Sequence, residues 1–226
     1  LNFNVRDEFE YAGGGGGFID KWGYPFCIGR IFNSYEKDTR QYNDTREIFW
    51  ASGACLFIRS KNYFEADGFD EDFFAYADDA EIGIRARLAG WKCLYVPGAI
   101  LYHKNSGTGG QHSPFKAFYV ERNRFWITLK YFPLPLLLFT PFFTIWRFAF
   151  QAYGALTHRG AAGKFTQMHS PWHLIGILFK AYGSGFRGLP KMWKKRRRLS
   201  RLRKVSFEEI FSWFKRFGIS AKEISL

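Results

Sequence analysis

The chain has 226 residues, 47% of them hydrophobic and 21% aromatic, which is enough apolar material for a packed core and argues against disorder. Its formal charge of +13 indicates an anionic partner: nucleic acid, acidic lipid or a phosphorylated substrate. The three cysteines have neither CxxC nor metal-ligand spacing, which disfavours a disulfide framework or zinc site and fits a reducing cytosol.

The composition changes near residue 130, because most acidic residues precede it and aromatic, aliphatic and basic residues follow. We therefore expect two modules, residues 1–112 and residues 113–226. The chain starts at Leu1 in sequence typical of the middle of a domain, so we also expect an N-terminal part to be missing.

Strand and helix signals alternate in the first module, which predicts an α/β fold. Five glycines at 13–17 predict a loop, and the apolar run 54–60 predicts a buried strand followed by a short helix capped by Ser60. After an aromatic loop at 68–76, three signals predict a helix over 78–90: acidic residues at its start, arginines near its end and a final glycine. Two further strands are expected at 93–96 and 99–103.

The second module is expected to be helical, starting with a helix over 113–132. The apolar stretch 131–146 contains three prolines and is shorter than the roughly 20 residues that a membrane-spanning helix needs, so we expect an interfacial or re-entrant segment. Basic residues cluster at 191–204, and Ser206 with Glu209 forms a capping box for an amphipathic helix over 206–217. This combination is typical of a peripheral membrane anchor.

Three carboxylates, Asp78, Asp79 and Glu81, gather at one helix N-terminus. Their mutual repulsion raises at least one pKa, whereas the helix dipole favours ionisation, so one carboxylate could serve as a general base near neutral pH. Ordinary helix capping is the alternative interpretation. Glu81 and Arg85 have the spacing of an i,i+4 ion pair.

His103 ends an expected strand and precedes a glycine-rich loop, a position where ligands are often held, although a structural histidine remains an alternative. Asp70, Glu71 and Asp72 form a literal DxD. We reject it as a metal-nucleotide site, because it lies in an aromatic loop rather than at a strand end after a βαβ unit.

The segment from FWASGACLFIRS through GFDEDFFAYADDAEIGIRARLAGW to YVPGAILYHKNSGTGG resembles the acceptor half of family 2 glycosyltransferases, especially bacterial rhamnosyltransferase-like and galactofuranosyltransferase-like enzymes. The resemblance spans roughly residues 8–132. It implies the C-terminal part of a GT-A, Rossmann-like fold and inverting sugar transfer from a nucleotide-sugar donor to a glycan or lipid-linked acceptor.

The resemblance also implies roles for individual residues. Asp79 would be the general base, with Asp78 orienting the acceptor, although Asp78 replaces the family's usual glutamate and is shorter by one methylene. Trp50, Ser52 and Gly53 would line the acceptor site. A loop over the donor phosphates would comprise Ser106, Gly107, Thr108, Gly109 and Gly110.

Mg²⁺ or Mn²⁺ is the cofactor that the resemblance implies, held by a DxD in the N-terminal half and by His103. Because that half is expected to be absent, we expect this chain alone to be inactive. An anionic membrane surface is the expected partner and the inner face of the cell membrane the expected location.

Two alternatives to an enzyme follow from the residues. In the first, the chain is a non-catalytic, membrane-peripheral binding module whose acidic cluster only caps a helix. In the second, the basic run 194–204 binds nucleic acid. The run lacks a recognised nucleic-acid-binding motif, and the neighbouring Trp193 and Phe-rich helix favour lipid instead.

Overall fold

The computed structural model describes residues 37–102, 110 and 113–218, together with the backbone of four short strands before them. The side chains of residues 160 and 161 are not included. The expected loops at 13–17 and 106–109, and His103, lie outside the described residues.

Three two-stranded antiparallel sheets are present in the described residues. They pair β1 (Phe18–Ile19) with β2 (Pro25–Phe26), β3 (Arg30–Ile31) with β4 (Ser34–Tyr35), and β5 (Arg46–Ile48) with β6 (Cys93–Tyr95). Strand β6 confirms the expected strand at 93–96, but residues 99–102 form no strand. No parallel strand pair occurs in the described part of the chain, so a Rossmann-like sheet is not part of it.

The expected strand at 54–60 is wrong. Residues 53–55 form a 3-10 turn (η1, Gly53–Cys55), in which the Ser52 hydroxyl accepts a hydrogen bond from the Ala54 N–H. The chain then runs to Arg59 without strand pairing, and Phe57 is 95% exposed. An apolar run that finds no neighbouring strand stays irregular. The short helix that follows is α1 (Ser60–Glu65), and Arg59 rather than Ser60 occupies its N-cap.

Helix α2 (Asp78–Leu88) confirms the expected helix almost to its ends. Gly90 follows it with a φ of +80°, the left-handed conformation that glycine adopts without steric cost. Every residue of α2 from Ala80 onward is buried, including its charged residues Glu81, Arg85 and Arg87. The helix is therefore central to the molecule.

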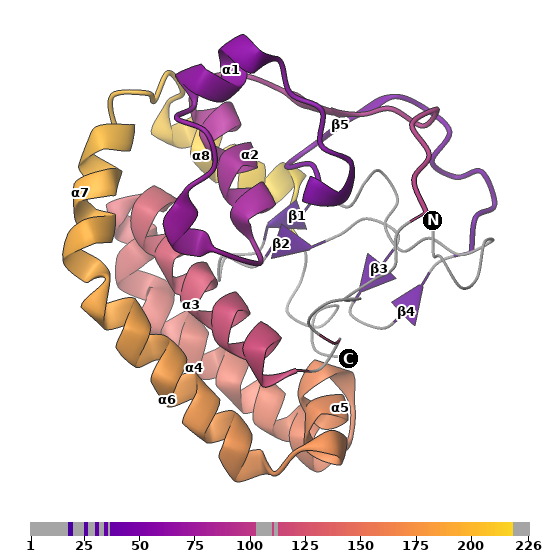
Figure 1. Cartoon of the computed structure of the whole chain (residues 1–226), viewed down its shortest axis with the longest axis vertical. Coiled ribbons are helices and arrows are strands. Elements are labelled where there is room, and N and C mark those ends of the chain that lie inside the picture. The colour runs from indigo at the N-terminus through magenta and orange to yellow at the C-terminus, as the bar shows by residue number, and fades with distance from the viewer. Residues whose placement is uncertain are drawn as a thin grey trace.

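The rest of the described chain is helical, as expected, and Figure 1 shows α3, α4 and α6 as a group of long helices beside the first module. Ser113 caps α3 by accepting a hydrogen bond from the Lys116 N–H. The helices are α3 (Pro114–Tyr131), α4 (Leu134–Leu156), α5 (Gly160–Met168), α6 (Pro171–Arg187), α7 (Leu189–Leu199) and α8 (Phe207–Arg216).

Helix α4 corrects the expectation for residues 131–146. It has 23 residues, because Pro133 and Pro135 lie at its N-terminus, where a missing N–H costs little, and Pro141 is accommodated inside. By length and composition α4 could cross a membrane. Only 11% of its most apolar 18-residue stretch is buried inside the protein. Arg147, the residue directly after the apolar stretch, is buried within the helix.

One hydrophobic core joins α2, α3, α7 and α8. Ile210, Trp213 and Phe217 of the α8 region are buried in this core, so they cannot face a membrane as the sequence suggested. Phe207 and Phe211 of the same helix remain exposed. The boundary at residues 112–113 stays a prediction, and the core is continuous across it.

Candidate active site

The acidic pair Asp78 and Asp79 forms the first two residues of α2, directly after the loop that precedes this helix. One Asp79 carboxylate oxygen, Oδ2, accepts a hydrogen bond of 2.9 Å from the Gly53 N–H, and Oδ1 accepts one of 2.8 Å from the Ala80 N–H. The carboxylate is thus fixed in orientation by two backbone donors, one of them from a segment 26 residues away. Gly53, predicted to line the acceptor site, is in direct contact with the predicted base.

Burial raises the pKa of Asp79 to about 6, against the hydrogen bond from Gly53 and with the Asp78 carboxylate contributing repulsion. Burial also raises the pKa of Asp78, with a smaller repulsive contribution from Glu81. A carboxylate with a pKa of about 6 is mostly ionised at neutral pH and binds a proton more tightly than an ordinary aspartate. Asp79 therefore combines a raised pKa with an orientation fixed by two backbone donors.

The other residues predicted for the acceptor site lie beside α2. Trp50 and Ser52 are buried. Gly83 of α2 faces Trp50 so closely that an added Cβ would lie 2.6 Å from the Trp50 Cβ, so only glycine allows this approach. The close packing sets the segment 50–53 against the start of α2. It brings Gly53 to Asp79, while the acceptor role of these residues stays a prediction.

Backbone strain precedes the acidic pair. Phe74, Tyr76 and Ala77 have φ values of 58°, 64° and 63°, in the left-handed region that residues with a Cβ rarely adopt. Such conformations persist only where neighbouring groups hold them.

Asn123 of α3 stabilises this strained loop. Its side-chain amide Nδ2 lies 2.8, 2.8 and 2.7 Å from the carbonyl oxygens of Phe73, Ala75 and Tyr76, so its two N–H groups are shared among three acceptors. Arg122 Nη2 donates to the carbonyls of Asp72 and Phe73. Asn123 is fully buried. Sequence reasoning missed both residues, whose signal was a run of four polar residues, 121–124, inside a helix rich in aromatic side chains.

Glu81 does not join the acidic pair. It is fully buried and accepts hydrogen bonds from Arg85 (2.6 Å from Nη2 to Oε2), Lys130 and Tyr131. The expected Glu81–Arg85 ion pair is confirmed, but as part of a buried network rather than on a surface. The three-carboxylate cluster is therefore a pair, Asp78 and Asp79, with Glu81 turned toward the core.

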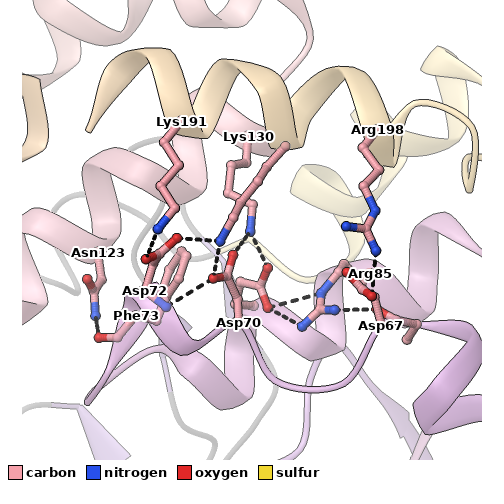
Figure 2. Close-up of polar contacts among 12 residues, drawn as sticks. Asp67, Asp70, Asp72, Phe73, Arg85, Asn123, Lys130, Lys191 and Arg198 are labelled. Atoms are coloured by element: carbon pink, nitrogen blue, oxygen red, sulfur yellow. Dashed lines mark hydrogen bonds and ion pairs between the residues drawn. The ribbon is translucent and has the colours of Figure 1, made fainter. Parts of the chain in front are cut away.

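The carboxylates of the DxD sequence, Asp70 and Asp72, form ion pairs with lysines, as Figure 2 shows. Lys130 Nζ lies 2.6 Å from Asp70, and Lys195 bridges Asp70 and Asp72. Burial would raise the pKa of Asp70, but Lys130 and Lys195 outweigh it and lower this pKa to about 2. These residues line a cavity of about 270 Å³ whose opposite charges neutralise one another. The arrangement is a structural ion-pair network that ties α7 to the loop before α2.

The remaining predicted site residues, His103 and Ser106 to Gly109, lie outside the described residues. Within the part of the chain that the structure describes, no group of three His, Cys, Asp or Glu side chains is arranged to hold a metal ion.

Comparison with known proteins identifies the class. The family model described as "Glycosyl transferase family group 2" matches residues 16–193, most of the chain. This chain belongs to that family, which implies its α/β class.

The curated relatives are rhamnosyltransferases. N-acetylglucosaminyl-diphospho-decaprenol L-rhamnosyltransferase of Mycobacterium tuberculosis, strains CDC 1551 / Oshkosh and ATCC 25618 / H37Rv, is 36% identical over 111 residues, covering 45% of this chain and 36% of the relative. Rhamnosyltransferase WbbL of Escherichia coli K12 is 34% identical over 56 residues, covering 25% of this chain and 21% of the relative. The match thus spans about a third or less of each relative. No solved structure matches this chain.

Proposed function

We propose that this chain carries the acceptor side and general base of an inverting glycosyltransferase. The observation that carries the proposal is Asp79, a carboxylate with a pKa of about 6 held by the Gly53 and Ala80 N–H groups beside the predicted acceptor segment. Family membership makes sugar transfer the reaction that such a base would serve.

In the proposed reaction, Asp79 takes the proton of the acceptor hydroxyl as its oxygen attacks the anomeric carbon of the donor sugar. The bond between that carbon and the phosphate oxygen breaks, and the nucleoside diphosphate leaves with the bonding electrons. A single displacement inverts the anomeric configuration. Asp79 ends the step protonated and returns its proton to solvent.

The neighbouring residues would prepare the base and the acceptor. Asp78 orients the acceptor, and its charge helps to keep the pKa of Asp79 raised. Trp50, Ser52 and Gly53 form the wall beside Asp79. Asn123 is a positioning residue, since it holds the strained loop that delivers the acidic pair.

For the donor, we propose a nucleotide-sugar whose diphosphate meets the loop 106–110, with Mg²⁺ or Mn²⁺ neutralising the leaving group. His103 is the proposed ligand from this chain. The described residues do not by themselves form a metal site.

The names of the relatives narrow the proposed substrates. The mycobacterial relative is named for L-rhamnosyl transfer and N-acetylglucosaminyl-diphospho-decaprenol. We therefore propose a rhamnosyl donor and a lipid-linked or cell-surface glycan acceptor. Such an acceptor would lie at a membrane. We therefore propose the membrane surface as a partner of this protein and the cytoplasmic face of that membrane as its location.

The test is transfer from a nucleotide-activated rhamnose by the gene product that carries this sequence. Asp79→Asn should lower turnover by about 10²–10⁴-fold, since the amide cannot accept the proton. Asp67→Asn, an exposed aspartate paired with Arg198, is the matched control and should keep normal turnover. The product of the unaltered protein should have the anomeric configuration opposite to that of the donor.

Equal turnover in Asp79→Asn and the control would exclude Asp79 as the base. That result would favour the alternative function, a non-catalytic membrane-peripheral binding module.

A further inference from the structure

An aromatic residue recurs every seven positions along α6 and α7. The four residues Trp172, Phe179, Phe186 and Trp193 are 79%, 76%, 56% and 37% exposed. Seven residues make nearly two helical turns, so residues at this spacing share one face of a helix. Gly188 between α6 and α7 has right-handed helical angles, and the two helices follow one another along the outside of the molecule (Figure 1).

Each of these aromatic residues is followed directly by a lysine, an arginine or a histidine. The four followers, all exposed, are His173, Lys180, Arg187 and Lys194. None of the ion pairs in the described part of the chain involves Lys180, Arg187 or Lys194. Other cations of α7 differ, since Lys191, Lys195 and Arg198 pair with aspartates of the loop before α2.

Acidic residues are missing from this region of the sequence. No aspartate or glutamate occurs between Glu121 and Glu208, although the region contains many lysines and arginines. The aromatic-basic face is therefore uniformly cationic. Its opposite side is the packed one, where Ile177, Ala181 and Gly185 are buried.

Helix α4 adds a second unpartnered apolar surface. Its exposed large side chains recur at helical spacing along its whole length and include no charge: Leu134, Leu138, Phe139, Phe142, Ile145, Trp146, Tyr153 and Leu156. Thr140, Arg147 and Gly154 form its buried line. Arg147 donates hydrogen bonds of 2.9 and 2.8 Å to the two carboxylate oxygens of Glu121 on α3.

The position of this ion pair indicates how α4 would meet a bilayer. Arg147 lies near the middle of α4, so a spanning α4 would carry the pair, and α3 with it, into the hydrocarbon, where charged groups are costly. An α4 that lies along the surface keeps the pair on the protein side.

We infer that the aromatic-basic face of α6 and α7 docks on an anionic membrane, with α4 lying along the same interface. Aromatic rings settle at headgroup depth, and each neighbouring cation meets lipid phosphate. A second copy of this chain fits the face poorly, because its cations would oppose one another. The inference rests on the membrane partner proposed above and names its surface.

The experiment is cosedimentation of the full chain with vesicles of phosphatidylcholine containing about a third phosphatidylglycerol, compared with phosphatidylcholine alone. We expect binding to the anionic vesicles that weakens at high salt. The double variant Trp172→Ser with Phe179→Ser should weaken vesicle binding by at least about tenfold, because it lacks the two rings whose transfer from water to the membrane favours binding. Lys180→Gln with Arg187→Gln and Lys194→Gln should remove most of the preference for anionic lipid.

The matched control is Phe57→Ser with Phe64→Ser, two aromatic residues that are 95% and 75% exposed elsewhere. It should bind like the unaltered chain, and circular dichroism should show all variants folded. Equal binding by the face variants and the control would overturn the inference. So would self-association in solution that the face variants abolish, since the occupant would then be a second copy.

The vesicle assay is independent of catalysis. Asp79→Asn should bind vesicles normally, so a failure of the proposed base and a failure of the membrane face give different results.

Discussion

At the scale of single residues, the structure separates two groups of carboxylates that the sequence places together. Asp79 is held by backbone N–H groups and has no cationic partner among the described residues, and its pKa rises to about 6. Asp70 is surrounded by Lys130 and Lys195, and its pKa falls to about 2. The first environment suits a group that exchanges a proton, whereas the second suits a permanent ion pair.

Asn123 provides a residue-scale test of positioning. Asn123→Ala removes the amide whose two N–H groups hold three carbonyls of the strained loop before α2. We expect kcat to fall by about 10- to 100-fold, because the acidic pair loses its fixed orientation. The apparent pKa of the base, measured from the pH dependence of the rate, should move down toward the ordinary value as water reaches Asp79.

A purely structural role for Asn123 would give a different outcome. The variant would then unfold at lower temperature but keep the original pH midpoint and, while folded, the original kcat.

At the scale of elements, helices with local end signals were predictable from the sequence. Asp78 and Gly90 mark the ends of α2, and Ser113 marks the start of α3, because caps and charges near helix ends act within one turn. Residues 54–60 and 131–146 were not predictable in this way. Whether an apolar run pairs, stays irregular or continues as a helix depends on what packs beside it, as Arg147 does with Glu121.

Which face of helix α8 is buried also depends on what packs beside it, and this burial can be tested. Trp213 is 5% exposed and packs with its ring centroid 5.6 Å from that of Phe49. Trp213→Ala should lower the free energy of unfolding by about 3–5 kcal/mol, measured by urea denaturation, because it leaves a cavity in the core.

Phe211→Ala on the same helix is the matched control, since Phe211 is 46% exposed. We expect a change within about 0.5 kcal/mol. Equally small effects of both substitutions would mean that α8 does not pack in the core.

At the scale of the whole molecule, the family and the acidic pair were predictable from the sequence, whereas the arrangement around them was not. Gly53 and Asp79 lie 26 positions apart, and Asn123 lies almost 50 positions from the carbonyls that it holds. No local pattern encodes such contacts. The distribution of charge also needed the structure, which assigns Lys191 and Lys195 to internal ion pairs and leaves Lys180, Arg187 and Lys194 on the outer face.

The most direct test of the account is the pH dependence of kcat/KM for sugar transfer by the gene product that carries this sequence. Since the base must be ionised, we predict that the rate falls as the pH drops through about 6, the pKa of Asp79. In Asp79→Asn, the residual rate should be low and lack this acidic limb. A limb that is unchanged in Asp79→Asn, or a normal rate at pH values well below 6, would contradict the assignment of Asp79 as the general base.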